Sequence, residues 1–354
     1  MIRGERSIGK PNRTIYFDIL NIFAIFCVVL LHHNGIAHSF SPTSAWEGAL
    51  TIEVLAFFAV PIFLMLTGAT LMEYRKRYDT KTFFRKRLLR VLIPFLVWMG
   101  LYFLWHLLAG DYLGEQIGLR WVYDMFMFNQ MNGVFWFFPM IIAIYLAMPV
   151  LSLLTEPKYR KWLWYLVGVG FITHSLLPPL LAMLGLDFNA AYKLPLLGSG
   201  FIIFPILGYL LSTIQKIPRK WFIVIIVTAV GCLVLRYLFT YFASYAISSV
   251  DRTLFSYVQF TSVIPAVAIF IIAKRINFSK FVSDKVTKVI ALISSASFGV
   301  YLLHIFVMAQ EQRLTSLENN SLWWLLVMPF ATYAICVVIV LTIKKIPFIR
   351  GIFP

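Results

Sequence analysis

Apolar residues occur along this chain in long runs without strict alternation, separated by short polar or basic connections. Most runs are about 20 residues long, the length at which an α-helix crosses a bilayer. Backbone groups in lipid must be paired within the chain, so the pattern predicts an all-α polytopic membrane helix bundle of about ten transmembrane helices. We expect residues 1–354 to form a single integral-membrane domain. The runs are 15–33, 49–72, 91–109, 133–154, 162–183, 195–214, 221–242, 254–273, 289–309 and 322–343.

The composition supports this interpretation. Of the residues, 60% are hydrophobic and only 13% are charged, and a soluble domain could not cover so much apolar surface. Cys27, Cys232 and Cys336 lie far apart inside apolar runs, without metal-ligand or redox spacing, and we expect them to be small core residues. The chain contains no P-loop, no H-E-x-x-H motif and no dinucleotide-binding glycine fingerprint. We therefore expect no metal and no bound cofactor.

The lysines and arginines predict an orientation. They gather before the first run and after every second run, and the alternate connections hold only Arg120, Lys193, Arg252 and Arg313. By the positive-inside rule both termini should be cytoplasmic. The same distribution accounts for the net charge of +16 without a nucleic-acid partner. The first run is about 17 apolar residues long, which favours a membrane span over a cleaved signal peptide.

Polar groups occur at both ends of the first run. In "FDILNIFAIFCVVLLHHNG", Asp18 lies near the cytoplasmic end, and His32 lies 14 residues, or about 21 Å, further along a helix. His33 and Asn34 follow directly. Ionisable groups inside a membrane are costly and often functional. The histidines can be interfacial groups that reach for water, or they can mark a reactive polar cavity that opens outward.

Two further charges have the same predicted depth. Glu53 starts the second run and Arg236 lies in the outer half of the seventh. In the cavity hypothesis His32 is a general base. Glu53 then holds its tautomer and Arg236 binds an anionic group or developing oxyanion. In the alternative, Arg236 snorkels or pairs with a carboxylate.

The segment "TKTFFRKRLLRVLIPF" predicts a basic amphipathic helix on the cytoplasmic side. Its guanidinium groups can lie on anionic lipid, or they can bind phosphates at a cavity mouth. Both alternatives use the cluster Arg85, Arg87 and Arg90. The predicted apolar face carries Phe84, Leu88, Val91 and Phe95.

Two aromatic-rich stretches are also candidates. The outer segment "RWVYDMFMFNQ", residues 120–130, is either an interfacial aromatic belt or a platform for a sugar ring. In "SSASFGVYLLH", residues 294–304, Ser297, Tyr301 and His304 fall on one helical face. Helix packing explains the small residues but not the tyrosine and histidine on that face.

Four stretches together resemble the acyltransferase 3 family, bacterial integral-membrane enzymes that acylate cell-surface sugars. They are "RTIYFDILNIFAIFCVVLLH", "FFRKRLLRVLIPF", "VFWFFPMIIAIYLAMPVLSLL" with Trp136, and "SFGVYLLH". The resemblance covers nearly the whole chain. The family commonly has a basic residue with ten residues between it and the histidine, whereas this chain has Asn21 there. Either another group such as Arg13 or Arg90 compensates, or the chain is a divergent member.

The resemblance implies an O-acyltransferase with acyl-coenzyme A, commonly acetyl-coenzyme A, as cytoplasmic co-substrate. The acceptor would be a hydroxyl of a polysaccharide or its lipid-linked precursor, and the location a bacterial plasma membrane. The catalytic candidates would be His32, Asp18 and His33. His32 would be the base or a transient acyl carrier, Asp18 would help order the cytoplasmic mouth, and His33 would line the acceptor side. Arg85, Arg87 and Arg90 would bind the donor. The acceptor site would hold Asn34, Glu53, Trp136, Arg236, Ser297, Tyr301 and His304.

Two other functions fit the polar positions. A transporter or flippase for a glycan intermediate would line a path with them and would not consume acyl-coenzyme A. A membrane sensor or accessory subunit would need no aligned polar cavity and should tolerate His32→Ala.

Overall fold

The computed structural model describes residues 14–112, 118–128, 130 and 132–353, and this part of the chain is helical and contains no strand. Within it, eight helical stretches are long and apolar enough to cross a membrane, which confirms the polytopic helix bundle. Arg3, Arg6, Lys10 and Arg13 lie outside the described residues. The helices are α1 Ile15–His33, α2 Ser44–Ala56, α3 Ala59–Leu71, α4 Thr80–Arg87, α5 Ile93–Ala109, α6 Leu119–Met127, α7 Phe137–Leu153, α8 Arg160–Gly170, α9 Leu177–Met183, α10 Ile203–Thr213, α11 Arg219–Ile247, α12 Phe260–Arg275, α13 Asp284–Thr315 and α14 Met328–Ile343.

Two of the ten predicted spans form helices shorter than 18 residues, which leaves eight of full spanning length among the described residues. The run 195–214 forms an 11-residue α10, because Gly198 and Gly200 take positive φ angles that end the helical path before it. The run 254–273 forms a 16-residue α12, and residues 248–259 before it are not helical. Irregular backbone at membrane depth is tolerated where protein or a cavity surrounds it, and nearly all of α10 is buried.

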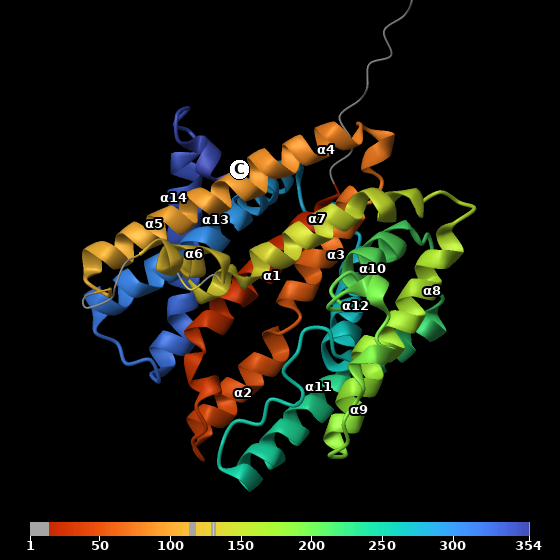
Figure 1. Cartoon of the computed structure of the whole chain (residues 1–354), viewed down its shortest axis with the longest axis horizontal. Helices are drawn as coiled ribbons and strands as arrows, with labels where there is room; N and C mark the ends of the chain where they lie inside the picture. The colour runs from red at the N-terminus through yellow and green to blue at the C-terminus, as the bar shows by residue number, and fades with distance from the viewer. Residues whose placement is uncertain (1–13, 113–117, 129, 131, 354) are drawn as a thin grey trace, which may run out of the picture.

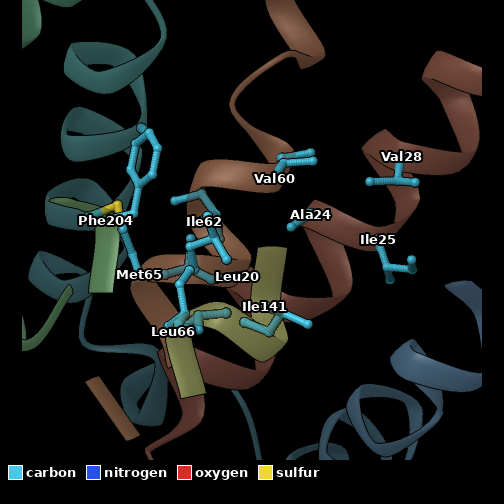
Figure 2. Packing of buried hydrophobic residues seen from close by; sticks show 14 of the residues in the cluster. Leu20, Ala24, Ile25, Val28, Val60, Ile62, Met65, Leu66, Ile141 and Phe204 are labelled. Carbon is cyan, nitrogen blue, oxygen red and sulfur yellow. The ribbon is translucent and has the colours of Figure 1, made fainter. Parts of the chain in front are cut away.

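The helices surround a central pair, α1 and α3. Helices α5, α13 and α14 lie on one side of this pair, and α8 to α12 lie on the other (Figure 1). Figure 2 shows the apolar core between them, where Leu20 of α1 lies next to Ile62 and Leu66 of α3. Burial of these side chains against one another fixes the position of α1 within the bundle.

Helices α3 and α10 cross with their backbones in contact. A Cβ atom added at Gly68 would lie 1.8 Å from the carbonyl oxygen of Pro205, and one added at Gly208 would lie 1.9 Å from that of Met65. Small residues at helix crossings allow this approach in membranes. The two glycines therefore determine how close α10 lies to the central helices.

Basic residues link the helix ends on one side of the bundle. Lys274, at the end of α12, donates to the carbonyl oxygens of Leu211 and Ser212 at the end of α10, over 2.6 and 2.9 Å. Lys344, after α14, donates to Ser295 O at 2.7 Å. The chain's C-terminal segment reaches the same side, next to α4 and α5 (Figure 1). The alternation of basic connections in the sequence thus matches one face of the fold.

The basic segment before the third span differs in detail from the prediction. Helix α4 runs into α5 through a π-helical turn, Leu88–Leu92, which adds a residue per turn and rotates the helix faces. Within α4 the buried phenylalanine is Phe83, whereas Phe84 and, in the π-helical turn, Leu88 are exposed. The expected apolar face was therefore wrong in its first half and correct at Val91 and Phe95.

Candidate active site

A cavity of about 630 Å³ runs along one face of α1. Asp18, Asn21, Ile25, Val28 and His32 line it, and the 14-residue step from Asp18 to His32 corresponds to about 21 Å of helix. The other walls come from α2, α3, α4, α7, α13 and residues 252–257. The cavity therefore extends from the side of the basic helix ends towards the opposite side. Its other polar lining residues are His38, Glu53, Thr67, Thr70, Arg87, Tyr145, Arg252, Tyr257, Ser294, Ser295, Ser297 and Tyr301.

His32 lies in the wall of the cavity. Its side chain is exposed, although α1 is central in the bundle, because it faces this space. The ring of His304, from α13, lies behind it with its centroid 5.0 Å from that of His32 and the planes at 45°. His304 is fully buried and is not among the lining residues. The structure thus places His32 where a substrate can reach it and places His304 against it.

His33 and Asn34 point away from the cavity, contrary to their predicted place. His33 is fully buried, its Nε2 is 2.8 Å from Thr332 Oγ1, and its ring lies on Trp324. Successive helical residues are about 100° apart, so His33 cannot share the face of His32. The Asn34 amide donates to Ala49 O at 2.7 Å and also bonds Glu53, so it supports the wall from behind.

Asn21 connects α1 to α13 inside the cavity. Its amide nitrogen donates to Ser294 O at 2.9 Å and to the hydroxyl oxygens of Ser294 and Ser297, each at 3.0 Å. The amide therefore holds a neutral polar cluster at the position where a basic residue was expected. Arg90, one of the groups suggested to compensate, is exposed and is not a lining residue.

Only one of the three predicted donor-site arginines reaches the cavity. Arg87 lines it, with its guanidinium carbon 5.7 Å from the ring centroid of Phe83 and 5.5 Å from that of Tyr145. Arg85 and Arg90 are exposed on the outside of the same segment. Arg87 and Asp18 thus lie at the end of the cavity near the basic helix ends.

Arg252, and not the predicted Arg236, faces the cavity. Arg236 is fully buried behind the wall, its guanidinium carbon is 3.8 Å from the ring of Phe57, and it donates to Ser262 Oγ at 3.2 Å. Arg252 is exposed to the cavity near Glu53 and His38. Arg236 therefore supports the wall electrostatically, and Arg252 supplies the accessible cation at this end.

Three parallel aromatic rings form one wall. Phe57 and Tyr257 stack at 4.1 Å with planes at 13°, and Tyr257 and Trp136 stack at 5.4 Å with planes at 12°. Phe57 occupies the break between α2 and α3, and Tyr257 belongs to the non-helical segment before α12. Phe57 lies between the Arg236 guanidinium and Tyr257, so both of its faces are covered, and Trp136 is the exposed ring of the stack. Trp136 was predicted here, whereas Phe57 and Tyr257 were not.

The residues of the motif 294–304 lie partly in the cavity wall and partly behind it. Ser297 and Tyr301 line the cavity, and the Tyr301 hydroxyl donates to the carbonyl oxygen of Val134. The aromatic segment 120–130 does not contribute to the described lining. Its Trp121 packs against Tyr112 and Phe103 instead, and residue 129 lies outside the described part. The aromatic stack in the cavity wall is therefore built by Trp136, Tyr257 and Phe57.

The comparison with known families decides the class of protein. The model of the acyltransferase domain of the acyltransferase 3 family matches residues 14–341, nearly the whole chain. The chain belongs to the acyltransferase 3 family. No curated protein sequence and no solved structure matches it. As a member of this family it is a multi-pass membrane acyltransferase, and the cavity that contains His32 is its candidate active site.

Several lining residues of this acyltransferase were missed from the sequence. Arg252 and His38 lie in connections that looked like ordinary exposed loops, and Tyr257 lay within a presumed span. The one available signal was the density of polar side chains between 248 and 259. There the Asp251 carboxylate accepts from Thr253 N and the Gln259 amide donates to Thr253 O, in place of helical hydrogen bonds. In the described residues, His, Cys, Asp and Glu do not gather in threes as metal ligands would.

Proposed function

We propose that this acyltransferase moves an acyl group, preferably acetyl, from cytoplasmic acyl-coenzyme A to a hydroxyl of a cell-surface glycan or its lipid-linked precursor. The observation that carries the proposal is the single cavity with different chemistry at its two ends. Arg87 lies at one end, the aromatic wall and Arg252 lie towards the other, and His32 is exposed within it. Its setting would be the plasma membrane of a bacterium.

The donor would enter from the end with Arg87. A guanidinium group binds phosphate oxygens with charge-assisted hydrogen bonds. The thin pantetheine arm would extend along the α1 face past Asn21 and Val28, which brings its thioester towards His32. The distance from Asp18 to His32, about 21 Å of helix, gives the arm an extended path.

The acceptor would enter from the opposite end. The exposed ring of Trp136, which stacks with Tyr257 and through it with Phe57, would hold the apolar face of a sugar ring, and Glu53 would accept hydrogen bonds from its other hydroxyl groups. Arg252 would bind an acidic group or a phosphate of the acceptor. A hydroxyl then lies between His32 and the thioester.

His32 would act as the general base. Its neutral ring removes the proton from the acceptor hydroxyl while the oxygen attacks the thioester carbonyl carbon. The tetrahedral intermediate collapses when the carbon–sulfur bond breaks, and the coenzyme A thiolate takes the proton from the imidazolium. The products are the ester and free coenzyme A. Removing a general base typically costs about 10²- to 10⁴-fold in rate.

The test measures transfer of radiolabelled acetyl from acetyl-coenzyme A to extracted surface glycan in membranes that contain the chain. His32→Ala is compared with wild type and with His106→Ala, whose histidine pairs with Asp111 outside the cavity. We expect label in the glycan with wild type and His106→Ala, and at least about 100-fold less with His32→Ala.

Three other results would change the proposal. Equal transfer by His32→Ala would remove His32 from the chemistry and leave the family assignment intact. Labelled protein before the acceptor is added would identify His32 as an acyl carrier. If wild type transferred no label while glycan export required the chain, the transporter alternative would replace acyl transfer.

A further inference from the structure

The hydrogen bonds of His304 fix where its ring proton lies. Nδ1 is 2.7 Å from the carbonyl oxygen of Tyr301 and 3.2 Å from that of Val300. Carbonyl oxygens can only accept, so Nδ1 must carry the proton. The ring is fully buried, and a buried imidazolium without a paired carboxylate would be costly. The neutral ring therefore keeps its lone pair on Nε2.

That lone pair has no donor in the described part of the chain. His304 Nε2 is buried and accepts no hydrogen bond from any described residue. Buried acceptors in proteins are generally paired, and an unpaired one needs an explanation. The neighbour that can supply a donor is His32, whose ring centroid is 5.0 Å away. A hydrogen bond between the two rings would place one His32 ring nitrogen about 3 Å from Nε2, the usual distance from an N–H donor to its acceptor.

The other titratable rings near this pair do not compete for the position. His33 extends to the opposite side of α1 and bonds Thr332, and His38 lies in the connection after α1. Glu311 accepts from Thr332 on the far side of His33. The group in contact with the ring of His32 from α13 is thus His304.

We propose that His304 is a positioning residue that accepts a hydrogen bond from His32 and so selects the tautomer of the catalytic base. This inference rests on the proposed function and deepens it. With its nearer N–H donated to His304, His32 keeps its lone pair on the other ring nitrogen, which faces the cavity. The acceptor hydroxyl then meets a base that is already oriented.

The same contact stabilises the charge that forms during the reaction. When His32 takes the proton of the acceptor hydroxyl, the bond to His304 Nε2 becomes charge-assisted and strengthens. The proton of His304 stays on Nδ1, and that of the substrate passes through His32 to the coenzyme A thiolate. The arrangement follows the logic of a base held by a third group, with a neutral imidazole in the place of a carboxylate.

Two variants of His304 separate this role from simple packing. In His304→Asn the amide nitrogen can keep the hydrogen bond to Tyr301 O, but nothing reaches the former Nε2 position. In His304→Gln the longer side chain brings its amide oxygen near that position and restores an acceptor. The assay is steady-state acetyl transfer by purified, reconstituted protein, with kcat and KM measured for both substrates.

We expect His304→Asn to lower kcat about 10- to 100-fold while both KM values stay within about twofold. His304→Gln should recover about tenfold of that loss. Wild-type kcat in His304→Asn would overturn the proposal. Equal losses in the two variants would also overturn it, because an acceptor at Nε2 would then not matter.

A direct measurement on wild type is independent of how the variants fold. Nitrogen-15 NMR of histidine-labelled protein reports which ring nitrogen carries each proton. We expect His304 with a protonated Nδ1 and an unprotonated Nε2, and we expect His304→Gln to leave the His32 tautomer unchanged. A protonated Nε2 on His304 would overturn the proposal. If wild type showed this tautomer pair but no acyl transfer, the proposed function alone would fail.

Discussion

Replacing Gly68 by alanine tests the backbone contact between α3 and α10. The new Cβ would lie 1.8 Å from Pro205 O and 2.4 Å from Pro205 C. An ordinary carbon–oxygen contact is about 3.3 Å, so the two helices must separate locally by about 1.5 Å. The clashing atoms are backbone, so no side-chain rotation relieves them.

The expected loss lies at the upper end of the range for overpacking, about 3 kcal/mol of unfolding free energy. With an unfolding entropy of about 2.1 cal/mol/K per residue, that corresponds to about 4 °C in Tm for a chain of 354 residues. The three free cysteines are buried, so a thiol-reactive fluorescent dye reports melting of detergent-solubilised protein. Thr67 and Thr70 of α3 line the cavity, and acyl transfer should fall together with Tm.

The matched control is Gly231→Ala in α11, where an added Cβ meets nothing within 4 Å. Alanine favours a helix over glycine by about 0.5–1 kcal/mol, so this variant should melt at or slightly above the wild-type temperature. Gly208→Ala should resemble Gly68→Ala, and the double variant should lose less than the sum, because one separation serves both. A Gly68→Ala protein that melted within about 1 °C of wild type would refute the packing argument.

Three further predictions concern the cavity. Arg87→Ala should raise the KM for acetyl-coenzyme A about 10- to 100-fold, whereas Arg85→Ala, whose side chain is exposed outside the cavity, should leave it near wild type. Asn21→Ala removes the donor shared by Ser294 and Ser297 and should lower the unfolding free energy by about 1–3 kcal/mol, as a melting curve would show; an unchanged Tm would mean that water replaces the amide. Burial and the charge of Arg252 lower the pKa of His38, so the folded state binds fewer protons than the unfolded chain just below about pH 6.5. Stability should therefore fall as pH drops through that window, and His38→Gln should show a smaller slope of Tm against pH than wild type.

The run lengths and the distribution of lysine and arginine predicted the helix bundle well, because lipid imposes a single period and length on most spans. They failed at α10 and α12, whose surroundings are protein. Two glycines at positive φ, Gly198 and Gly200, and the side-chain-capped segment 248–259 interrupt the helices there. A hydropathy value averaged over about 20 residues does not detect such short breaks in a helix.

Depth along a span could be predicted, but rotation around it could not. Arg236 and Arg252 were both placed towards the outer end of the bundle by counting residues, yet only Arg252 faces the cavity. Which face of a helix turns inward depends on neighbours that come from distant parts of the chain. His304 shows the same limit, since its depth was correct and its contact with His32 was not foreseen.

The spacing between Asn21 and His32 fixes how their side chains are placed relative to each other on α1. The step from one to the other is eleven residues, which on an α-helix is within about 20° of three full turns and about 16 Å long. Helix α1 is unbroken over this distance, so it keeps the two side chains on one face at a fixed separation, whatever their identity. Inserting one residue between them would turn His32 by about 100° towards the side now occupied by His33, and deleting one would turn it by the same angle the other way, towards the side of Leu31. A member of the family can therefore carry another residue in place of the basic one, as this chain does with Asn21, but the spacing between that position and His32 has to stay.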